Sequence, residues 1–501
     1  MAKRLVAAAG AVIFGAGVLV GMGRPVAVAE PETGAAREVP GIGACGTDAR
    51  PEHVSVVPKT VEVPVAYPVV TVDTGPLPEN TKRVTMELPP DPCENPCPDL
   101  TDTPAPPPGL GEQLGLPKLI LRPQPFNFAL PNPNPPALPP GPEPAHPATE
   151  PAAQSPARPA PQVSDVREVS KLTGADSLNR TDKRWQVQGT DLGIMWQSAP
   201  DEIAIAFGDT VGREFHPPGG MGEDWRSNLL AFSKNRDLAN GVVFDRMVTD
   251  DRCHAAEMLS SRKMDNIEIT TIPTSGFALG DRQYMSYMSI RTWNSVPGTW
   301  YTNYGGLAYS DDHGEHWTKD PHAKWENIFG VSSFQVAAMV PQGDWVYMFG
   351  IPNTRLGGVG LARVPKDQVL NPTAYQYWQG GSWAPTMNGT ATATPIVDAP
   401  AGELSVRYDE DRKVWQMSYL DTAKAGLVVR ESDSPQGMWS DSAVTVSALQ
   451  FPELYGGFIH PWSTGQDLYF TMSTWNDYNV YLMHATLNRA PRKGGPAQSV
   501  R

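Results

Sequence analysis

The sequence lacks the motifs that identify several common classes of enzyme. It contains no glycine-rich phosphate loop, no nucleophile elbow, and no spacing of histidine, cysteine and carboxylate residues typical of a metal site. The segment Gly357–Gly360 follows a predicted turn rather than opening a helix, so it does not indicate nucleotide binding. We therefore expect no cofactor and no catalytic metal.

Long apolar runs are also absent after the first residues. Lys3 and Arg4 precede the apolar stretch Leu5–Gly23, and Ala27–Ala29 fits a small-residue cleavage site. This pattern predicts a signal peptide over residues 1–29, with an uncleaved membrane anchor as the alternative. We expect an exported protein, secreted or associated with the cell envelope, that contacts a membrane only if the signal is retained.

Basic residues and cysteine are scarce. The net charge is -14, and removal of the predicted signal would take away three basic residues and leave -17. Such an acidic chain is not expected to bind nucleic acid or anionic lipid through its overall field, whereas a neutral sugar polymer is a compatible partner. Four cysteines in an exported chain favour disulfides, with all three pairings open. They are Cys45, Cys93, Cys97 and Cys253.

Proline dominates the segment 30–162, which contains the first three cysteines. Because proline fixes φ and removes a hydrogen-bond donor, this segment is predicted to be an extended or disordered arm. Val54–Val72 alternates β-branched residues and is expected to form a small strand pair. Residues 491–501 are expected to be a disordered tail.

Tryptophan, tyrosine and glycine replace proline over residues 163–490, where two kinds of short apolar run alternate five times. The first kind comprises Ile203–Phe207, Tyr284–Ile290, Trp345–Gly350, Trp415–Leu420 and Leu468–Ser473. The second comprises Leu229–Ser233, Gly306–Ser310, Gly360–Val364, Gly426–Arg430 and Tyr481–Ala485. Five paired copies predict an all-β, five-bladed β-propeller, and a jelly roll or immunoglobulin-like array is the competing architecture.

The segment Ser310–Trp317 matches the Asp-box pattern S-x-D-x-G-x-x-W, and Ser432–Trp439 is a degraded copy. We expect Asp312 to accept turn hydrogen bonds and Trp317 to pack between strands. The motif therefore indicates a blade hairpin rather than chemistry.

Two aspartates are predicted to meet across one hairpin. Val187–Gln197 and Ile203–Asp209 are predicted strands around a turn, and Asp191 and Asp209 each lie nine residues from Pro200. Opposed residues of an antiparallel pair point to one face with Cβ atoms about 4.5–5.5 Å apart. Two neighbouring carboxyls are what a glycosidase uses as acid and base or as acid and nucleophile. Because Asp209 ends an apolar strand, we expect it to be the acid, with Asp191 as the base.

Further polar and aromatic residues are candidates for binding substrate. Arg226 and Asn228 share one face near the start of the Leu229 strand, where a surface ion pair with Glu223 or Asp224 is the alternative for the arginine. Others are expected where blades meet a central funnel, and they are Tyr304, Gln335, Arg355, Trp462 and Trp475.

The hairpin GTD…FGDT, the segment EDWRSN, and WVYMFGIPNTRLGGVGLARV followed by AYQYW are similar to glycoside hydrolase family 183 over roughly residues 163–487. That resemblance implies a five-bladed propeller that cleaves internal α-D-arabinofuranosyl linkages with inversion. It also implies arabinogalactan and lipoarabinomannan of mycobacterium-like cell walls as substrates. The resemblance further implies that Asp191 and Asp209 are the catalytic pair.

Two alternatives to an endo-D-arabinanase remain at this point. One is a non-catalytic carbohydrate-binding propeller attached to the envelope, and the other is a scaffold with the arm as spacer. A sialidase is disfavoured because no motif supplies its three arginines or its tyrosine nucleophile. We expect a monomer.

Overall fold

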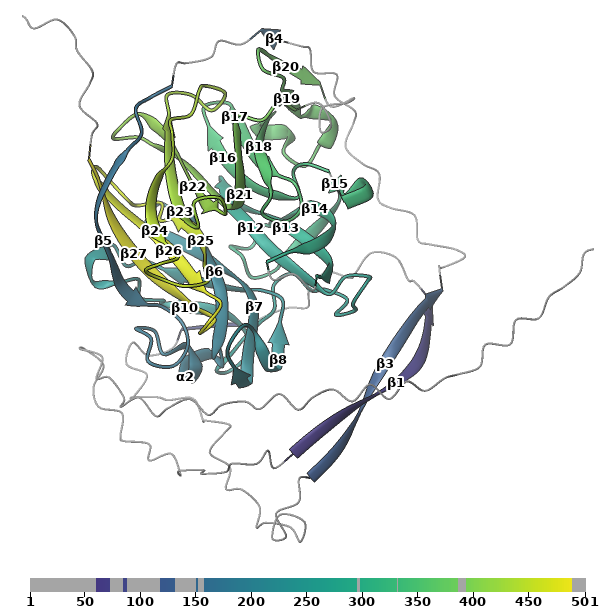
Figure 1. The fold of residues 1–501 in the computed structure, drawn as a ribbon. Helices are drawn as coiled ribbons and strands as arrows, with labels where there is room; N and C mark the ends of the chain where they lie inside the picture. Colours follow the sequence, from purple (N-terminus) through teal and green to yellow (C-terminus); the bar gives the residue numbers. More distant parts are fainter. Residues whose placement is uncertain are drawn as a thin grey trace, which may run out of the picture. The chain divides into compact units, whose positions relative to one another are not determined.

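The computed structural model describes residues 60–72, 84–87, 118–130, 150–151, 157–294, 298–330, 332–385 and 393–488. Strands dominate these residues, with one five-residue α-helix, α2 (Thr181–Trp185), so the prediction of an all-β chain is confirmed (Figure 1). Within this part of the chain no helix has the length and apolarity to cross a membrane. The predicted signal peptide and C-terminal tail lie outside the described residues.

The antiparallel strands form four sheets, and the ten-stranded one comprises two groups joined by the pairing of β18 (Gly357–Pro365) with β21 (Val397–Asp409). We therefore describe five groups that follow one another along the chain. The first contains β6 (Gly189–Ala199), β7 (Glu202–His216), β9 (Leu229–Ser233) and β10 (Arg246–Asp251), flanked by β8 (Met221–Arg226), β11 (His254–Ala255) and β2 (Val84–Glu87). The second contains β12 (Thr270–Leu279), β13 (Arg282–Trp293), β14 (Trp300–Ser310) and β15 (Thr318–Glu326).

The remaining groups follow the same order. The third contains β16 (Val336–Gln342), β17 (Trp345–Ile351), β18 (Gly357–Pro365), β19 (Gln376–Trp378) and β20 (Ser382–Pro385), with β4 (Glu150–Pro151) at its edge. The fourth contains β21 (Val397–Asp409), β22 (Val414–Asp421), β23 (Gly426–Ser432) and β24 (Ala443–Ser447). The fifth contains β25 (Leu454–Ile459), β26 (Asp467–Thr474), β27 (Asn479–Asn488) and β5 (Gln162–Lys171), so a strand from before the first group completes the last.

The first strand of each group contacts the first strands of its two neighbours. β6 contacts β12 and β25, and the series β12, β16, β21 and β25 closes the ring. We call the end of each group at which its first strand begins the upper end. The upper ends of β6, β12 and β25 adjoin, because Tyr455 near the start of β25 bonds Asp191 near the start of β6, and Thr270 at the start of β12 bonds Asp209. Loops that join the second to the third strand of each group also lie at the upper end.

The predicted repeat coincides with the second and third strands of every group, from β7 and β9 to β26 and β27. The run Ile203–Phe207 is not in the innermost strand of its group, because β6 provides the ring contacts and β7 lies between β6 and β9. Both faces of this run are buried, with alternate residues entering two different apolar clusters. An apolar run without polar alternation thus marked a strand covered on both faces.

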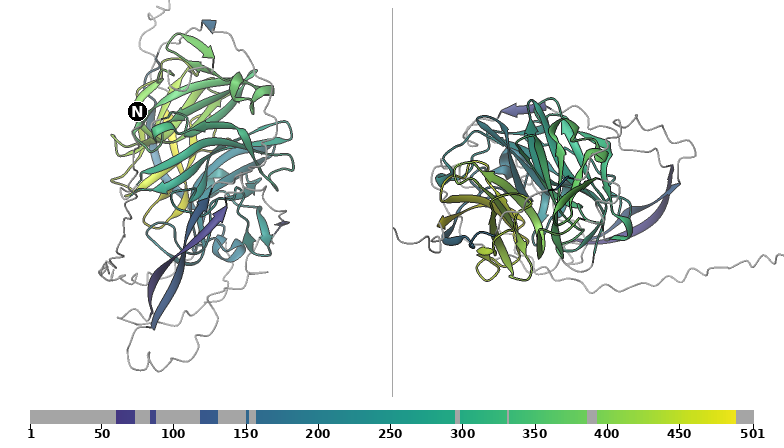
Figure 2. Two further views of the ribbon diagram at one scale, coloured as in Figure 1. Left: turned by 90° about the vertical axis from the view of Figure 1, so that its right-hand side faces the viewer. Right: turned by 90° about the horizontal axis from the view of Figure 1, so that it is seen from above.

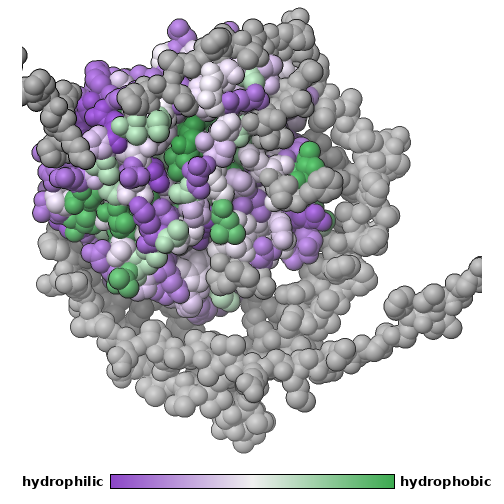
Figure 3. Space-filling view, turned by 45° about the horizontal axis from the view of Figure 1, so that its top comes forward, coloured by the Kyte–Doolittle hydropathy of each residue, from purple (hydrophilic) through white to green (hydrophobic). Residues whose placement is uncertain are grey.

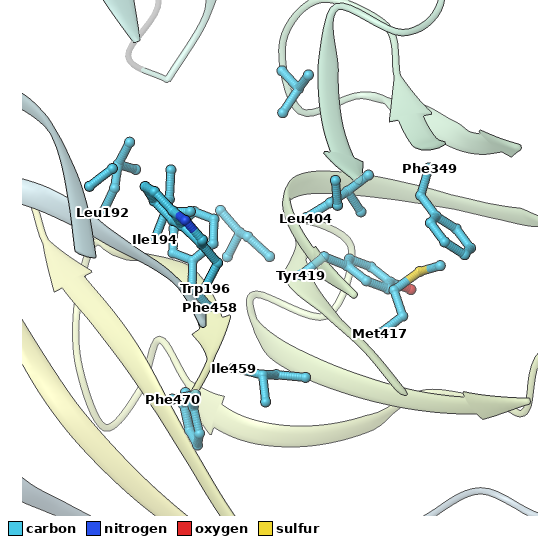
Figure 4. Close-up of a cluster of buried hydrophobic side chains, with 14 of the residues drawn as sticks. Leu192, Ile194, Trp196, Phe349, Leu404, Met417, Tyr419, Phe458, Ile459 and Phe470 are labelled. Carbon is cyan, nitrogen blue, oxygen red and sulfur yellow. The ribbon is translucent and has the colours of Figure 1, made fainter. Parts of the chain in front are cut away.

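The largest apolar cluster joins all five groups. Figure 4 shows part of it, with Leu192, Ile194 and Trp196 of β6 near side chains of the other ring strands and their neighbours. Burial of this surface ties the groups to one another. On the face shown in Figure 3, apolar residues form small separate patches within a mostly polar surface.

The Asp-box has the predicted structural role in the hairpin between β14 and β15. Asp312 accepts a hydrogen bond from the Ser310 hydroxyl at 2.8 Å, and Gly314 has a φ of +88°. Trp317 is 2% exposed and donates through Nε1 to the Gly314 carbonyl at 3.0 Å.

Parts of the arm are described as strands. β1 (Thr60–Val72) pairs in parallel with β3 (Lys118–Leu130), which gives the twisted ribbon in Figure 2. β2 pairs with β10, close to Cys253, which is disulfide-bonded. The partner of Cys253 lies outside the described residues.

Candidate functional site

The predicted register of the β6–β7 hairpin is found on both sides of the two aspartates. Gln197 pairs with Ile203 near the turn, and Thr190 pairs with Thr210 beyond the aspartates. Between them, two compensating irregularities occur, and Leu192 and Gly193 have φ values of +70° and +74°. Asp191 and Asp209 therefore lie together in a distorted segment at the upper end of the strands, and both are partly exposed.

Asp191 is held by residues that are distant in the sequence. Its Oδ2 accepts a hydrogen bond from the Tyr455 hydroxyl at 2.9 Å, and Tyr478 provides a second side-chain hydrogen bond. Oδ1 is buried without a hydrogen-bond partner among the described residues. A Cβ built on Gly208 would lie 2.3 Å from this oxygen, so the absence of a side chain at position 208 makes room for the carboxyl.

These surroundings favour the protonated form of Asp191. Loss of hydration is the largest cause and the negative charge of Asp209 is the second, and together they raise the pKa of Asp191 to about 8. The hydrogen bonds from Tyr455 and Tyr478 oppose this shift, and the charge of Glu403 adds to it.

Asp209 has more groups around it that stabilise a negative charge. The Thr270 hydroxyl donates to its Oδ1 at 2.5 Å, Trp225 provides another side-chain hydrogen bond, and the ammonium of Lys263 is nearby. Burial nevertheless raises the pKa of Asp209 to about 7. Lys263 is itself fixed over the Trp225 ring, 4.0 Å from its centroid, and pairs with Glu257 at 2.5 Å.

Two carboxyls that interact and titrate near neutrality behave as one coupled pair. Near pH 7 to 8 such a pair retains one proton, which belongs mainly to Asp191 because its pKa is the higher. The site therefore offers one proton donor and one proton acceptor in the same small region.

Arg355 and Glu403 extend the site beyond Tyr455. The Arg355 Nε lies 2.9 Å and its Nη2 2.5 Å from the same Glu403 oxygen, and the guanidinium lies 5.3 Å from the centroid of the Tyr455 ring. The other carboxylate oxygen of Glu403 is buried and has no partner within the described ranges. Arg355 is thus connected to Asp191 through Tyr455.

Trp475 lies near Asp191, to which Tyr478 connects it. Its ring is 47% exposed and packs edge-on against Tyr478 with centroids 5.7 Å apart, and Tyr478 bonds Asp191. A Cβ on Gly219 would lie 2.4 Å from this ring, so the β7–β8 turn holds the indole closely.

Arg226 and Asn228 are not placed to bind a ligand. Arg226 pairs across the sheet with Thr210, which puts it on the face opposite to Asp209. Its guanidinium bonds the carbonyls of Ala255 and Gln186 and pairs with Asp224 at 3.2 Å. Asp224 is one of the two partners given in the alternative, but the guanidinium is buried and the ion pair does not lie at the surface. Asn228 is fully buried, and all its hydrogen bonds go to backbone groups.

We expect replacement of Asn228 by alanine to destabilise the fold by about 2–4 kcal/mol. The change would leave the carbonyls of Leu259 and Thr271 and the amides of Met258 and Leu259 without their partner. Urea denaturation of this variant beside Asn240→Ala, an exposed position, measures the difference. Equal midpoints for the two variants would contradict a structural role.

Three other candidates have their contacts elsewhere. Gln335 is 1% exposed and bonds Thr302 and the Trp325 carbonyl. Tyr304 packs against Tyr287, and burial raises its pKa to about 12. Trp462 follows the end of β25 and therefore lies at the opposite end of the ring strands from Tyr455.

Sequence reasoning missed Tyr455, Tyr478, Thr270, Trp225, Lys263 and Glu403. Thr270 begins β12 and Tyr455 is the second residue of β25, so both occupy positions near the start of a ring strand, as Asp191 does. Alignment of the ring strands, rather than of the second and third strands, could have found these two. In the described part of the chain no three His, Cys, Asp or Glu side chains are grouped to hold a metal ion.

The model of the domain of unknown function DUF4185 matches residues 176–484, which include every strand from β6 to β26. Notoamide biosynthesis cluster protein J of Aspergillus sp. (strain MF297-2) is 34% identical over 334 residues, covering 63% of this chain and 86% of that protein. The uncharacterized 35.9 kDa protein in the asd 3' region of Mycolicibacterium smegmatis is 27% identical over 154 residues, covering 27% and 44%.

Solved structures of glycoside hydrolases are similar to this chain at low identity. Zg3597, a family 117 glycoside hydrolase of Zobellia galactanivorans, has 11% identity and a TM-score of 0.39, covering 66% of this chain and 91% of that one. The catalytic domain of Coprinopsis cinerea GH62 α-L-arabinofuranosidase has 9% identity and a TM-score of 0.36, covering 67% and 98%.

Proposed function

The chain belongs to the DUF4185 domain family, and we propose that it is an exported glycoside hydrolase that cleaves α-D-arabinofuranosyl linkages within cell-wall arabinan. The observation that carries the chemistry is the pair Asp191 and Asp209, with pKa values of about 8 and about 7, on one hairpin. The substrate rests on the resemblance to glycoside hydrolase family 183. We interpret the ring of five strand groups as a five-bladed β-propeller.

In the proposed reaction, Asp191 is the acid and Asp209 the base, which reverses the roles expected from the sequence. Protonated Asp191 donates to the glycosidic oxygen while Asp209 removes a proton from the water that attacks the anomeric carbon. The bond between that carbon and the oxygen breaks, and the product has inverted configuration. Asp191 is then ionised and Asp209 protonated, and exchange with solvent restores both. Thr270, Trp225 and Lys263 support this assignment because they stabilise the anion of Asp209.

This assignment predicts a bell-shaped dependence of kcat/KM on pH. Activity should rise as Asp209 loses its proton near pH 7 and fall as Asp191 loses its proton near pH 8, with the maximum between these values. Initial rates of arabinan cleavage from pH 5 to 10, with circular dichroism at each pH as a control for folding, measure the profile. A maximum at pH 4–5 would contradict the assignment.

The function itself is tested by incubating the purified chain with arabinogalactan and lipoarabinomannan, and with α-L-arabinan and β-1,3-galactan as controls. We expect a range of oligoarabinosides early in the reaction from the first two polymers and no release from the controls. A folded protein that binds arabinogalactan without releasing sugar would support the alternative, a non-catalytic carbohydrate-binding propeller at the envelope.

A further inference from the structure

Only two of the fourteen tryptophans, Trp475 and Trp293, are exposed. A ring contact with Tyr478 links Trp475 to Asp191. A longer series of contacts through the Arg355 guanidinium links Trp293 to the same carboxyl. Trp475 is 47% exposed and Trp293 is 43% exposed, whereas most of the others are buried or packed in the core. Exposed indoles near a reactive site are unusual because burial of a tryptophan side chain is normally favourable. The exposure of these two indoles therefore needs a physical explanation.

The first link is short. Trp475 follows β26 and contacts Tyr478 edge-on with centroids 5.7 Å apart, and Tyr478 bonds the Asp191 carboxyl. The indole is thus one ring away from the proposed acid, and it belongs to the fifth strand group.

The second link is longer and leads to the second strand group. Tyr455, which bonds Asp191, lies 5.3 Å from the Arg355 guanidinium, and that guanidinium lies 5.6 Å from the centroid of the Trp300 ring. Trp300 is 4% exposed and contacts Trp293 edge-on with centroids 6.0 Å apart. The Trp300 Nε1 is buried and has no hydrogen-bond partner in the described part of the chain.

The two exposed indoles lie on opposite sides of the hairpin that holds the aspartates. In the ring of first strands, β6 has β25 of the fifth group on one side and β12 of the second group on the other. Trp293 is the last residue of β13 and Trp475 follows β26, and each of these second strands ends at the upper end of its group, the end of β6 at which Asp191 lies. The acid–base pair is therefore flanked by an aromatic surface in each direction.

We propose that Trp475 and Trp293 are stacking surfaces for sugar rings on the two sides of the cleaved linkage, so that the site takes an internal stretch of a neutral furanosyl polymer. This inference rests on the proposed hydrolase function and adds to it the residues that engage the chain. An exposed aromatic face offers apolar area without charge, which suits the apolar face of a sugar ring. Because Trp475 is one ring from Asp191 and Trp293 is several contacts away, Trp475 binds next to the linkage and Trp293 binds a more distant sugar.

Binding of D-arabinan oligosaccharides by the full chain tests this proposal. Isothermal titration in the Asp191→Asn background compares Trp475→Ala, Trp293→Ala and the control Met438→Ala, which is 57% exposed and follows the opposite end of β23. We expect Trp475→Ala to weaken binding of short and long oligosaccharides roughly 3- to 10-fold. Trp293→Ala should weaken only the long ones by a similar factor, and Met438→Ala should change neither.

Two results would overturn the proposal, and they differ from failure of the hydrolase assignment. If the parent cleaves arabinan but both tryptophan variants bind like the background, the stacking surfaces are refuted and the hydrolase stands. If loss of Trp293 weakens short and long ligands equally, the two-sided arrangement is refuted. If the parent neither cleaves nor binds arabinan, both proposals fail together. Circular dichroism of each variant excludes misfolding as the cause.

Discussion

Replacing Asp191 or Asp209 by asparagine is expected to lower kcat on arabinan by about 10³-fold. Each change removes one partner of a proton transfer, and such transfers contribute typically 10²–10⁴-fold. Asparagine preserves the shape of the side chain, so KM should change much less than kcat. The matched control is Asp201→Asn in the turn of the same hairpin, where the side chain is exposed. If either site variant keeps an activity within a few-fold of this control, the catalytic residues lie elsewhere.

The Asp191→Asn variant should also differ from its parent in stability, in a way that depends on pH. Because the folded-state pKa of Asp191 is raised to about 8, protonation favours the folded state. That contribution is complete below the pKa of the unfolded chain, near 4, and is lost as the pH rises through 8. Asparagine resembles the neutral acid. The difference in free energy of unfolding between variant and parent should therefore shift in favour of the variant by on the order of 2–4 kcal/mol when the pH is raised from 4 to 9. Urea denaturation at both pH values measures this gain, and a constant difference would argue against a raised pKa.

Replacing Gly208 by alanine is expected to lower kcat by about 10²-fold without removing a polar group. The new Cβ would lie 2.3 Å from the Oδ1 of Asp191, so the carboxyl must turn away from the position in which Tyr455 holds it. A displacement of about 1 Å in a reacting group is sufficient for a loss of this size.

Gly381→Ala provides the matched control for this change. No atom lies within 4 Å of a Cβ built at position 381, so the control should retain both activity and stability. If Gly208→Ala has the same activity as Gly381→Ala, catalysis does not depend on the observed position of the Asp191 carboxyl.

The sequence was sufficient to predict that the two aspartates lie in one region of the hairpin, because the side-chain direction in a strand alternates with a period of two. The register counted from Pro200 holds at Gln197–Ile203 and at Thr190–Thr210, whereas the pairing between these points is irregular and does not include a direct pair of Asp191 with Asp209. The same alternation led to a wrong placement of Arg226. It shows which residues of a strand share a face, but not whether that face is the one that carries Asp209. Only its pairing with Thr210, which was not predicted, turns it away from Asp209.

Contacts between distant strand groups could not be predicted from local patterns. Tyr455 bonds Asp191 across 264 residues, and Thr270 bonds Asp209 across 61. Their contacts depend on closure of the ring, in which β25 and β12 become the neighbours of β6. The position of Trp462 was wrongly predicted for a related reason. Strand order and direction decide at which end of the ring a loop lies, and the loop that contains Trp462 follows the end of β25.

The crystal structure of the Asp191→Asn variant with a bound D-arabinan oligosaccharide tests the proposed function most directly. We expect the glycosidic oxygen within hydrogen-bonding distance of residue 191 and a water molecule between Asp209 and the anomeric carbon. Sugar rings should lie on both sides of that linkage, toward Trp475 and toward Trp293. An oligosaccharide bound away from the β6–β7 hairpin, with neither aspartate near a linkage, would contradict the assignment of this pair as the catalytic acid and base.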